Sequence, residues 1–220
     1  MSPSAPYNST VFVVDDDEQM RESLAALLDV LGFKVKAFSA PGAFHRFYRA
    51  SMPGCLLLDI RMPRQNGLEL YEQLLSEGKK LPVIFLTAHA DVSTAVAAMK
   101  TGAIEFLEKP YEREALVQLI EKALKLDAQW RASDEQFAAI ADRVNKLTAA
   151  QREMLELIRA GETNKAIASR LAITERAVEM RRSTIMRKLK VRTAAELVDL
   201  AATHRILAEL RGAKAHRIAT

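Results

Sequence analysis

Hydrophobic residues in the first half of the chain occur in short runs, separated by longer amphipathic stretches. The runs are rich in Val, Ile, Leu and Phe, and they occupy residues 11–14, 35–38, 55–58, 83–86 and 104–107. Short runs of this kind are typical of buried strands, and strands that alternate with helices pair in parallel with helices on both faces. The pattern therefore predicts an α/β domain with a doubly wound, five-stranded parallel sheet over residues 1–126.

The stretches between the runs predict helices at residues 18–31, 41–49, 67–77 and 91–101, with a further helix beginning near Glu112. Three of these stretches end directly before a glycine, which commonly terminates a helix. After Pro110, neither Gly nor Pro occurs before Gly161, and no strand-like run follows Gly161. The second half of the chain is therefore predicted to be entirely helical.

Polar side chains follow four of the five runs. Asp15 and Asp16 follow the first run, Asp59 the third, Thr87 the fourth and Lys109 the fifth. Because α/β proteins bind ligands where the carboxyl ends of parallel strands meet loops, these five side chains are expected to lie together. Three gathered carboxylates repel one another unless a divalent cation joins them, and oxygen ligands favour Mg²⁺.

In such a pocket Asp59 could act as a nucleophile toward a phosphoryl group. Lys109 and Mg²⁺ would neutralise the phosphoryl oxygens, and the Thr87 hydroxyl would donate a hydrogen bond to them. The alternative is local, because aspartates before Glu18 could cap a helix and Asp59 could form a turn. We prefer that alternative for Asp17 alone, since five polar residues at strand ends are hard to produce by chance.

These residues resemble the receiver domain of two-component response regulators. The matching motifs are VVDDDE (13–18), LLLDIRMPRQNG (56–67), FLTAHAD (85–91) and GAIEFLEKPYE (102–112), and the resemblance spans residues 9–126. It implies a flavodoxin-like fold in which Asp59 accepts a phosphoryl group from a partner sensor histidine kinase.

The resemblance also assigns the ligands of a magnesium ion. It implies that Asp16 binds Mg²⁺ directly and Asp15 through water, with Asp59 and the main-chain carbonyl of Arg61 as further ligands. Lys109 would pair with the acyl phosphate, and the peptide bond to the proline after it is expected to be cis.

The resemblance further implies a switch in which Thr87 follows the phosphate and the ring of Phe106 turns inward. The family often has tyrosine at position 106. Phenylalanine there removes a hydroxyl, and with it any switch that depends on its hydrogen bond.

Charge is distributed unevenly between the two halves. Residues 1–126 hold 14 Lys and Arg against 16 Asp and Glu, whereas residues 127–220 hold 18 against 12. The second half is therefore the candidate for a polyanionic partner, although a surplus of this size is also common on solvated surfaces.

Residues 147–191 predict three short helices with the proportions of a helix-turn-helix. One covers 149–159, a second begins after Thr163 and a third begins after Thr174, with only the turn 172–174 between the last two. The third helix is basic along its flanks and places Val178, Ile185 and Leu189 at core spacing. A basic helix with a mixed polar face suits the major groove of DNA, whereas a helical bundle with a solvated basic face is the simpler alternative.

Residues 145–205 resemble the LuxR-type helix-turn-helix of NarL/FixJ-type regulators. The resemblance rests on LT at 147–148, on GETNKAIASRLAIT at 161–174 and on the series Val178, Ile185, Lys188 and Leu189. Ala150 and Gln151 replace the usual Arg-Glu pair, and Arg181 replaces the usual histidine.

By this resemblance, three residues meet base edges: Glu179, Met180 and Ser183. Glu179 could accept from a cytosine amino group and Met180 could pack on a thymine methyl. Six others are assigned to phosphates, which set position and affinity without reading sequence: Thr163, Lys165, Arg176, Arg181, Arg182 and Lys188. A fourth helix, from Thr193 to about Leu210, is expected by analogy to help two copies pair.

The connection at 127–144 is predicted to be a helical linker between a receiver domain at 1–126 and a DNA-binding domain at 145–220. Apolar residues recur there at a heptad-like spacing, which favours one long helix that either dimerises or docks on its own domains. Ser133 and Gln136 could instead form a capping box that divides the helix.

The resulting hypothesis is a response regulator and transcription factor in which phosphorylation of Asp59 promotes homodimerisation and binding to double-stranded promoter DNA. Its only enzymatic chemistry would be autophosphorylation and autodephosphorylation. The chain has no apolar stretch of membrane-spanning length and no signal-like start, so we expect it to be cytoplasmic, without a membrane partner. Two alternatives are a phosphorylation-independent LuxR-type regulator and an aspartate-based phosphohydrolase, although Gln19 stands where the phosphohydrolase motif needs threonine.

Overall fold

The computed structural model describes residues 9–88 and 103–218. The chain forms two compact units, Met1–Arg131 and Ala132–Thr220, each described here by itself. The three-part division expected from the sequence, with a separate linker at 127–144, stays a prediction. The helix expected at 91–101 lies outside the described residues.

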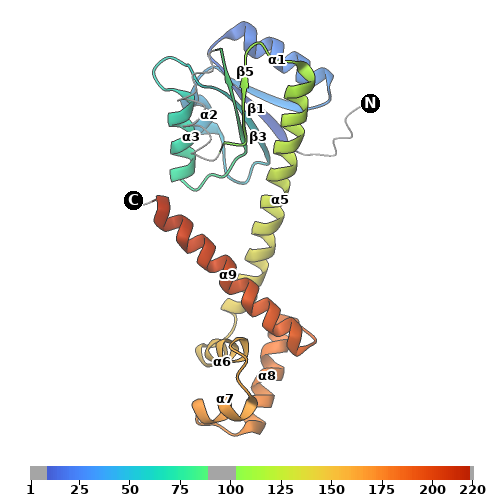
Figure 1. Cartoon of the computed structure of the whole chain (residues 1–220), viewed down its shortest axis with the longest axis vertical. Coiled ribbons are helices and arrows are strands. Elements are labelled where there is room, and N and C mark those ends of the chain that lie inside the picture. The colour runs from blue at the N-terminus through green and yellow to red at the C-terminus, as the bar shows by residue number, and fades with distance from the viewer. Residues whose placement is uncertain (1–8, 89–102, 219–220) are drawn as a thin grey trace. The chain divides into compact units, whose positions relative to one another are not determined.

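The first unit contains a five-stranded parallel sheet in the order β2-β1-β3-β4-β5 (Figure 1). Its strands are β1 (Thr10–Val14), β2 (Lys34–Phe38), β3 (Gly54–Asp59), β4 (Val83–Thr87) and β5 (Glu105–Glu108). This order and direction confirm the predicted doubly wound α/β fold, and they place β1 and β3, the strands that precede the candidate aspartates, side by side at the centre.

Helices cover both faces of this sheet: α1 (Glu18–Val30), α2 (Pro41–Phe47), α3 (Gly67–Ser76) and α5 (Arg113–Asn145). Alternate residues of β1 point to opposite faces, so that Phe12 and Val14 pack with α2 and α3, whereas Val11 and Val13 pack with α1 and α5. The two central strands are thus buried on both sides, which fixes the positions of the residues at their carboxyl ends.

Asp17 is the N-cap of α1. Its carboxylate accepts hydrogen bonds from the main-chain nitrogens of Gln19 and Met20, at 2.9 and 3.2 Å. The local explanation is therefore correct for this one aspartate, and it leaves Asp15 and Asp16 for another purpose.

Helix α5 runs without a break for 33 residues, so the division suggested by Ser133 and Gln136 is wrong. Two of the apolar residues at heptad-like spacing in 127–144 are Ile140 and Val144, and both pack into the core of the second unit. These two residues therefore pack against their own chain.

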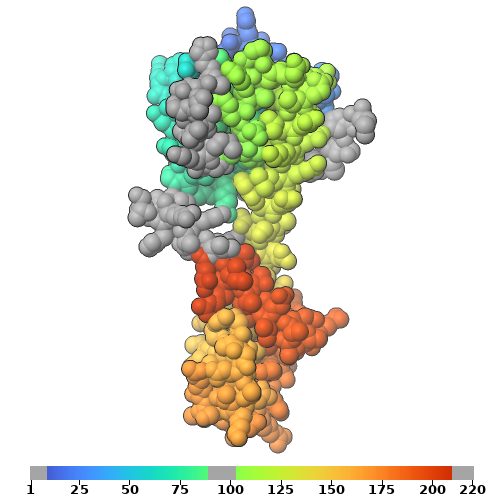
Figure 2. Space-filling view, viewed as in Figure 1, coloured from blue at the N-terminus to red at the C-terminus, as the bar shows by residue number. Residues whose placement is uncertain are grey.

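The second unit is helical, as predicted. Besides the end of α5 it contains α6 (Ala149–Arg159), α7 (Asn164–Arg170), α8 (Glu175–Leu189) and α9 (Ala194–Ile218). Threonine hydroxyls cap α6, α7 and α8, and α9 is longer than the sequence pattern predicted. Figure 2 shows α6, α7 and α8, in yellow and orange, as adjoining surfaces. Among the described residues, no helix combines the length and the apolar character needed to cross a membrane.

Candidate phosphorylation site and DNA-binding surface

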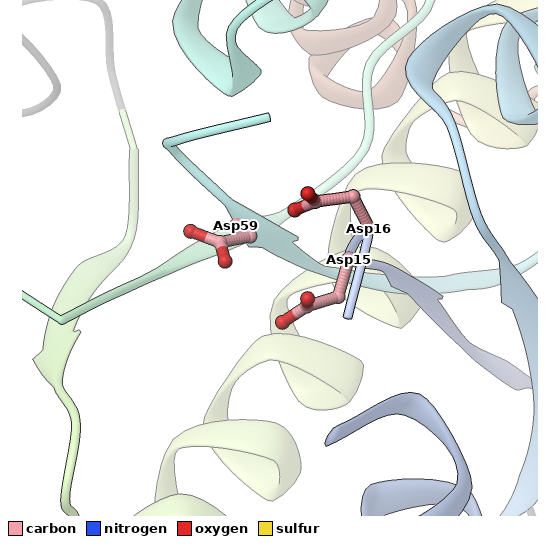
Figure 3. Close-up of side chains that lie close together, drawn as sticks. All are labelled: Asp15, Asp16 and Asp59. Carbon is pink, nitrogen blue, oxygen red and sulfur yellow. The ribbon is translucent and has the colours of Figure 1, made fainter. Parts of the chain in front are cut away.

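The ends of β1 and β3 bring three carboxylates together. One oxygen each from Asp15, Asp16 and Asp59 lies within 4.8 Å of the others (Figure 3). Asp15 is only 1% exposed and Asp59 is 9% exposed, whereas Asp16 is open to solvent. Parallel pairing of the two strands places their carboxyl ends at the same edge of the sheet, and this produces the cluster that the sequence predicted.

Lys109, after β5, lies between the two buried carboxylates. Its Nζ donates to Asp15 Oδ2 at 2.7 Å and to Asp59 Oδ2 at 3.0 Å. Burial alone would lower the pKa of Lys109, but the hydrogen bonds and charges of the two aspartates outweigh burial and raise it. The Lys109–Pro110 bond is cis, as expected, and the Lys109 nitrogen donates to the Thr87 carbonyl at 2.7 Å.

The loop after β3 holds the Asp59 side chain and main chain in place. The Arg61 nitrogen donates to Asp59 Oδ1 at 3.1 Å. Gly67, at the start of α3, approaches so closely that a Cβ there would lie 2.2 Å from the Asp59 carbonyl oxygen. The role of Gly67 was not predictable from the sequence, because a close main-chain approach leaves no signal in a single sequence.

Arg21 is a second residue whose role was not predictable from the sequence. This half-buried side chain of α1 donates from one terminal nitrogen to the carbonyl oxygens of Asp15 and Asp16, at 3.0 and 2.8 Å. The Asp17 nitrogen meanwhile donates to Asp15 Oδ1 at 2.9 Å. Hydrogen bonds from the Arg21 side chain and from the Asp17 nitrogen thus fix the segment that carries two of the three clustered carboxylates.

The cluster has the composition of a divalent-cation site. Asp15 and Asp59 share the ammonium group of Lys109, and Asp16 adds a third carboxylate beside them, so these four side chains together carry an excess of negative charge. Exposure of Asp16 leaves a hard oxygen ligand accessible from solvent, which suits an ion that keeps several water ligands, as Mg²⁺ does. The residues present therefore fit the ion that the sequence suggested.

The two proposed switch residues occupy different settings. Thr87 is 1% exposed at the end of β4. Phe106, on β5, is partly buried and packs against the core under α2 and α3. Thr87 lies on β4, directly beside β3, and Phe106 lies on β5, the next strand out, so both are on the side of the sheet that contains Lys109.

The helix-turn-helix presents the three residues assigned to base edges, Glu179, Met180 and Ser183, on the surface of α8. Met180 is 67% exposed, which is unusual for a large apolar side chain, whereas Val178 on the same helix is fully buried. An exposed methionine between a carboxylate and a hydroxyl gives this face a mixed apolar and polar character.

Most of the six residues assigned to phosphates are exposed, but their surroundings differ. Thr163 uses its hydroxyl to cap α7, with the Ala166 nitrogen donating to it at 3.2 Å. Lys188 donates to Gln151 Oε1 at 2.9 Å and to the Lys146 carbonyl at 3.3 Å. Gln151, which replaces a residue of the family's usual Arg-Glu pair, therefore joins the start of α6 to the end of α8.

The other four residues assigned to phosphates are all cationic, and they differ in exposure. Lys165 and Arg176 are exposed, whereas Arg181 and Arg182 are half-buried. The buried Nε of Arg182 makes no hydrogen bond within the described part of the chain. A buried, unpaired donor costs free energy, and a phosphate oxygen is a strong acceptor for a guanidinium group.

Comparison with known proteins matches both units. Residues 11–121 match the response regulator receiver domain, and residues 145–201 match the LuxR family of bacterial regulatory proteins. The chain is 40% identical over 192 residues to the transcriptional regulatory protein FixJ of Bradyrhizobium diazoefficiens, covering 87% of this chain and 93% of FixJ. It is 36% identical over 190 residues to the response regulator protein TodT of Pseudomonas putida, covering 86% and 84%.

Solved structures agree with this match. The response regulator StyR has a TM-score of 0.80 and 43% identity, covering 89% of this chain and 99% of its own. Full-length FixJ has a TM-score of 0.55 and 37% identity, covering 90% and 98%. The chain therefore belongs to the transcriptional response regulators that join a receiver domain to a LuxR-type DNA-binding domain.

Proposed function

We propose that Asp59 is the phosphoryl acceptor of this regulator and that a sensor histidine kinase is its donor. The observation that carries this proposal is the pairing of Asp59 and Asp15 around the single ammonium of Lys109, beside an exposed third carboxylate. A carboxylate of this kind is a nucleophile. The neighbouring ammonium group of Lys109 would stabilise the negative charge of a phosphoryl group bound to it.

The residues of the pocket divide the work of transfer. An Asp59 oxygen attacks phosphorus in line with the leaving imidazole nitrogen of the kinase, so that an acyl phosphate forms as the nitrogen–phosphorus bond breaks. Asp16, Asp59 and the Arg61 carbonyl, with Asp15 through water, would hold Mg²⁺, whose positive charge would stabilise the phosphoryl oxygens. Lys109 exchanges a carboxylate partner for a phosphoryl oxygen without leaving its position.

Phosphorylation adds charge to a pocket that is already acidic. The response of nearby side chains to this charge would transmit the change to the rest of the domain. The added group carries roughly two negative charges. Thr87 would follow its oxygens, and the Phe106 ring would turn further inward on the neighbouring strand. The surface formed by the end of the sheet would then favour a second copy of the chain.

The output is binding of a dimer to double-stranded promoter DNA. Glu179, Met180 and Ser183 would meet base edges. Thr163, Lys165, Arg176, Arg181, Arg182 and Lys188 would lie near phosphates. Two weak DNA-binding units on adjacent half-sites gain affinity from the connection between them, so dimerisation and DNA binding rise together. Because the partner is bacterial promoter DNA, we place this activity in the cytoplasm.

The experiment compares wild type with Asp59→Ala, each with and without acetyl phosphate and Mg²⁺. Size and DNA affinity are measured by light scattering and by gel shift on duplexes that the treated wild type selects from a random pool. We expect the donor to increase both dimer mass and DNA affinity in wild type and neither in Asp59→Ala. Equal DNA affinity in all four samples would instead support a phosphorylation-independent regulator, and repeated turnover of the donor beyond one equivalent per chain at a high rate would support a phosphohydrolase.

A further inference from the structure

The three consecutive aspartates after β1 are stabilised in different ways. The Asp17 carboxylate caps α1, and the Asp15 carboxylate accepts hydrogen bonds from Lys109 and from the Asp17 nitrogen. The exposed carboxylate of Asp16 makes no hydrogen bond or ion pair within residues 9–88 and 103–218. The direction of the Asp16 side chain therefore depends on the main chain that carries it.

Arg21 holds that main chain. One terminal nitrogen of its guanidinium group donates to the Asp16 carbonyl at 2.8 Å and to the Asp15 carbonyl at 3.0 Å. Because Arg21 lies on α1, one turn beyond the Asp17 cap, the same helix fixes both the end of the loop and the cation that contacts it. A rigid helix thus sets the position of two adjacent acidic residues.

We propose that Arg21 is a positioning residue for divalent-cation binding at the Asp15, Asp16 and Asp59 cluster. Arg21 does not touch the ion, and this inference rests on the proposed function of that cluster. It acts by fixing the peptide units of Asp15 and Asp16, so that their carboxylates stay directed toward Asp59 when like-charge repulsion would separate them.

Two physical effects of Arg21 have opposite signs. Its positive charge repels a cation, so removing it would tighten cation binding if charge were the main effect. Its hydrogen bonds order the ligands, so removing it would weaken binding if positioning were the main effect. Loss of a residue that orients metal ligands typically weakens affinity by about 10- to 100-fold, and both guanidinium contacts already face carbonyl oxygens that offset its charge. We therefore expect positioning to win.

The test measures binding of Mn²⁺ alone, from the paramagnetic resonance signal of the free ion, by the full-length chain without any phosphoryl donor. Arg21→Ala is expected to weaken Mn²⁺ binding by about 10-fold or more. Arg21→Lys keeps a donor with the same charge and is expected to recover most of the affinity. A bare charge effect would give the opposite order, with Arg21→Ala binding more tightly than wild type.

Arg49 provides a matched control. Its guanidinium group likewise donates from one nitrogen to main-chain carbonyls, those of Arg46, Phe47 and Tyr48 at the carboxyl end of α2, and it contacts none of the clustered aspartates. Arg49→Ala should leave Mn²⁺ affinity unchanged. Melting temperatures of both alanine variants in chelator show whether the loss of an arginine clamp alone destabilises the fold.

The outcomes separate the two proposals. If wild type does not bind Mn²⁺, the metal site of the proposed function fails. If wild type binds Mn²⁺ and Arg21→Ala binds it equally or more tightly, the role of Arg21 fails while the metal site stands. Equal weakening by Arg21→Ala and Arg49→Ala would show a general loss of structure and would also overturn the role of Arg21.

Discussion

The two ends of strand β3 each combine a glycine with a buried aspartate, but they differ in how completely the charge is compensated. At the amino end, Asp127 of α5 is 2% exposed, and its Oδ2 accepts from the Gly54 nitrogen at 2.9 Å and from Arg131 Nε at 2.8 Å. The remaining Arg131 nitrogens donate to the carbonyls of Ala50 and Met52. One negative charge therefore meets one positive charge, and each guanidinium nitrogen of Arg131 has an acceptor.

At the carboxyl end the charge does not balance. Asp59 and Asp15 share the ammonium of Lys109, and Asp16 adds a third negative charge beside them. Buried charge is therefore no sign of function by itself. The amino end is a closed arrangement that stabilises the fold, whereas the carboxyl end retains an excess of negative charge, which the proposed cation would offset.

The largest expected effect comes from breaking the closed end. Asp127→Ala leaves the Arg131 guanidinium without its partner, and losing one member of a buried pair typically costs about 3 to 5 kcal/mol. We expect a loss of that order in the free energy of unfolding, measured by urea denaturation, with partial recovery in the Asp127→Ala, Arg131→Ala double variant. A loss below about 1 kcal/mol, the value of an exposed pair, would show that the amino end is not the closed arrangement described here.

The open end should respond in the opposite direction. Asp59→Asn removes one of the crowded carboxylates while leaving Lys109 paired with Asp15, so in the presence of chelator we expect the free energy of unfolding to rise by about 1 kcal/mol. The comparison with Asp127→Asn, measured in the same buffer, provides the control. A decrease for both variants would erase the distinction between the two ends.

A further effect, confined to alkaline pH, is a pH dependence of stability near the closed end. Burial raises the pKa of Tyr48 to about 12, although the nearby Arg131 guanidinium lowers it. The unfolded value is about 10, so between these two pH values the unfolded chain loses a proton that the native chain retains. The stability contributed by neutral Tyr48 is present below about pH 10 and is lost as the pH rises toward the folded pKa.

Tyr48→Phe should therefore reduce the alkaline loss of stability, as followed by urea denaturation at rising pH. Tyr71, whose pKa burial also raises to about 12, serves as the reference, because neither Asp127 nor Arg131 contributes to its shift. If Tyr48→Phe and wild type lost stability in parallel up to pH 12, the assignment of that proton to Tyr48 would be wrong.

The open end was predictable from the sequence, and the closed end was not. Asp15, Asp16 and Asp59 directly follow apolar runs, so the parallel pairing of strands was enough to bring them together. Asp127 lies 73 residues from Gly54 along the chain, and nothing in local spacing indicates that its carboxylate turns inward. Contacts between distant segments of this kind depend on side-chain direction, which periodicity does not specify.

The same limit applies to the loops and to α5. Arg21 and Gly67 act on the main chain of the acidic cluster, and main-chain contacts leave little trace in residue types. The Ser133 and Gln136 pair suggested a helix start that did not occur, because a capping pattern inside a continuous helical stretch competes with an unbroken series of main-chain hydrogen bonds. The capping threonines Thr163 and Thr174 did predict the starts of α7 and α8 correctly.

We propose that the carboxyl end of β3 accepts a phosphoryl group, and that Asp59 is the acceptor. The most direct measurement is intact-mass spectrometry, with peptide mapping, of wild type, Asp59→Asn and Asp127→Asn incubated with acetyl phosphate and Mg²⁺ under conditions where all three are folded. The account predicts one phosphoryl group on Asp59 in wild type and in Asp127→Asn, none in Asp59→Asn, and none in any sample that contains chelator. An adduct that persists in Asp59→Asn, or no adduct in wild type, would contradict it.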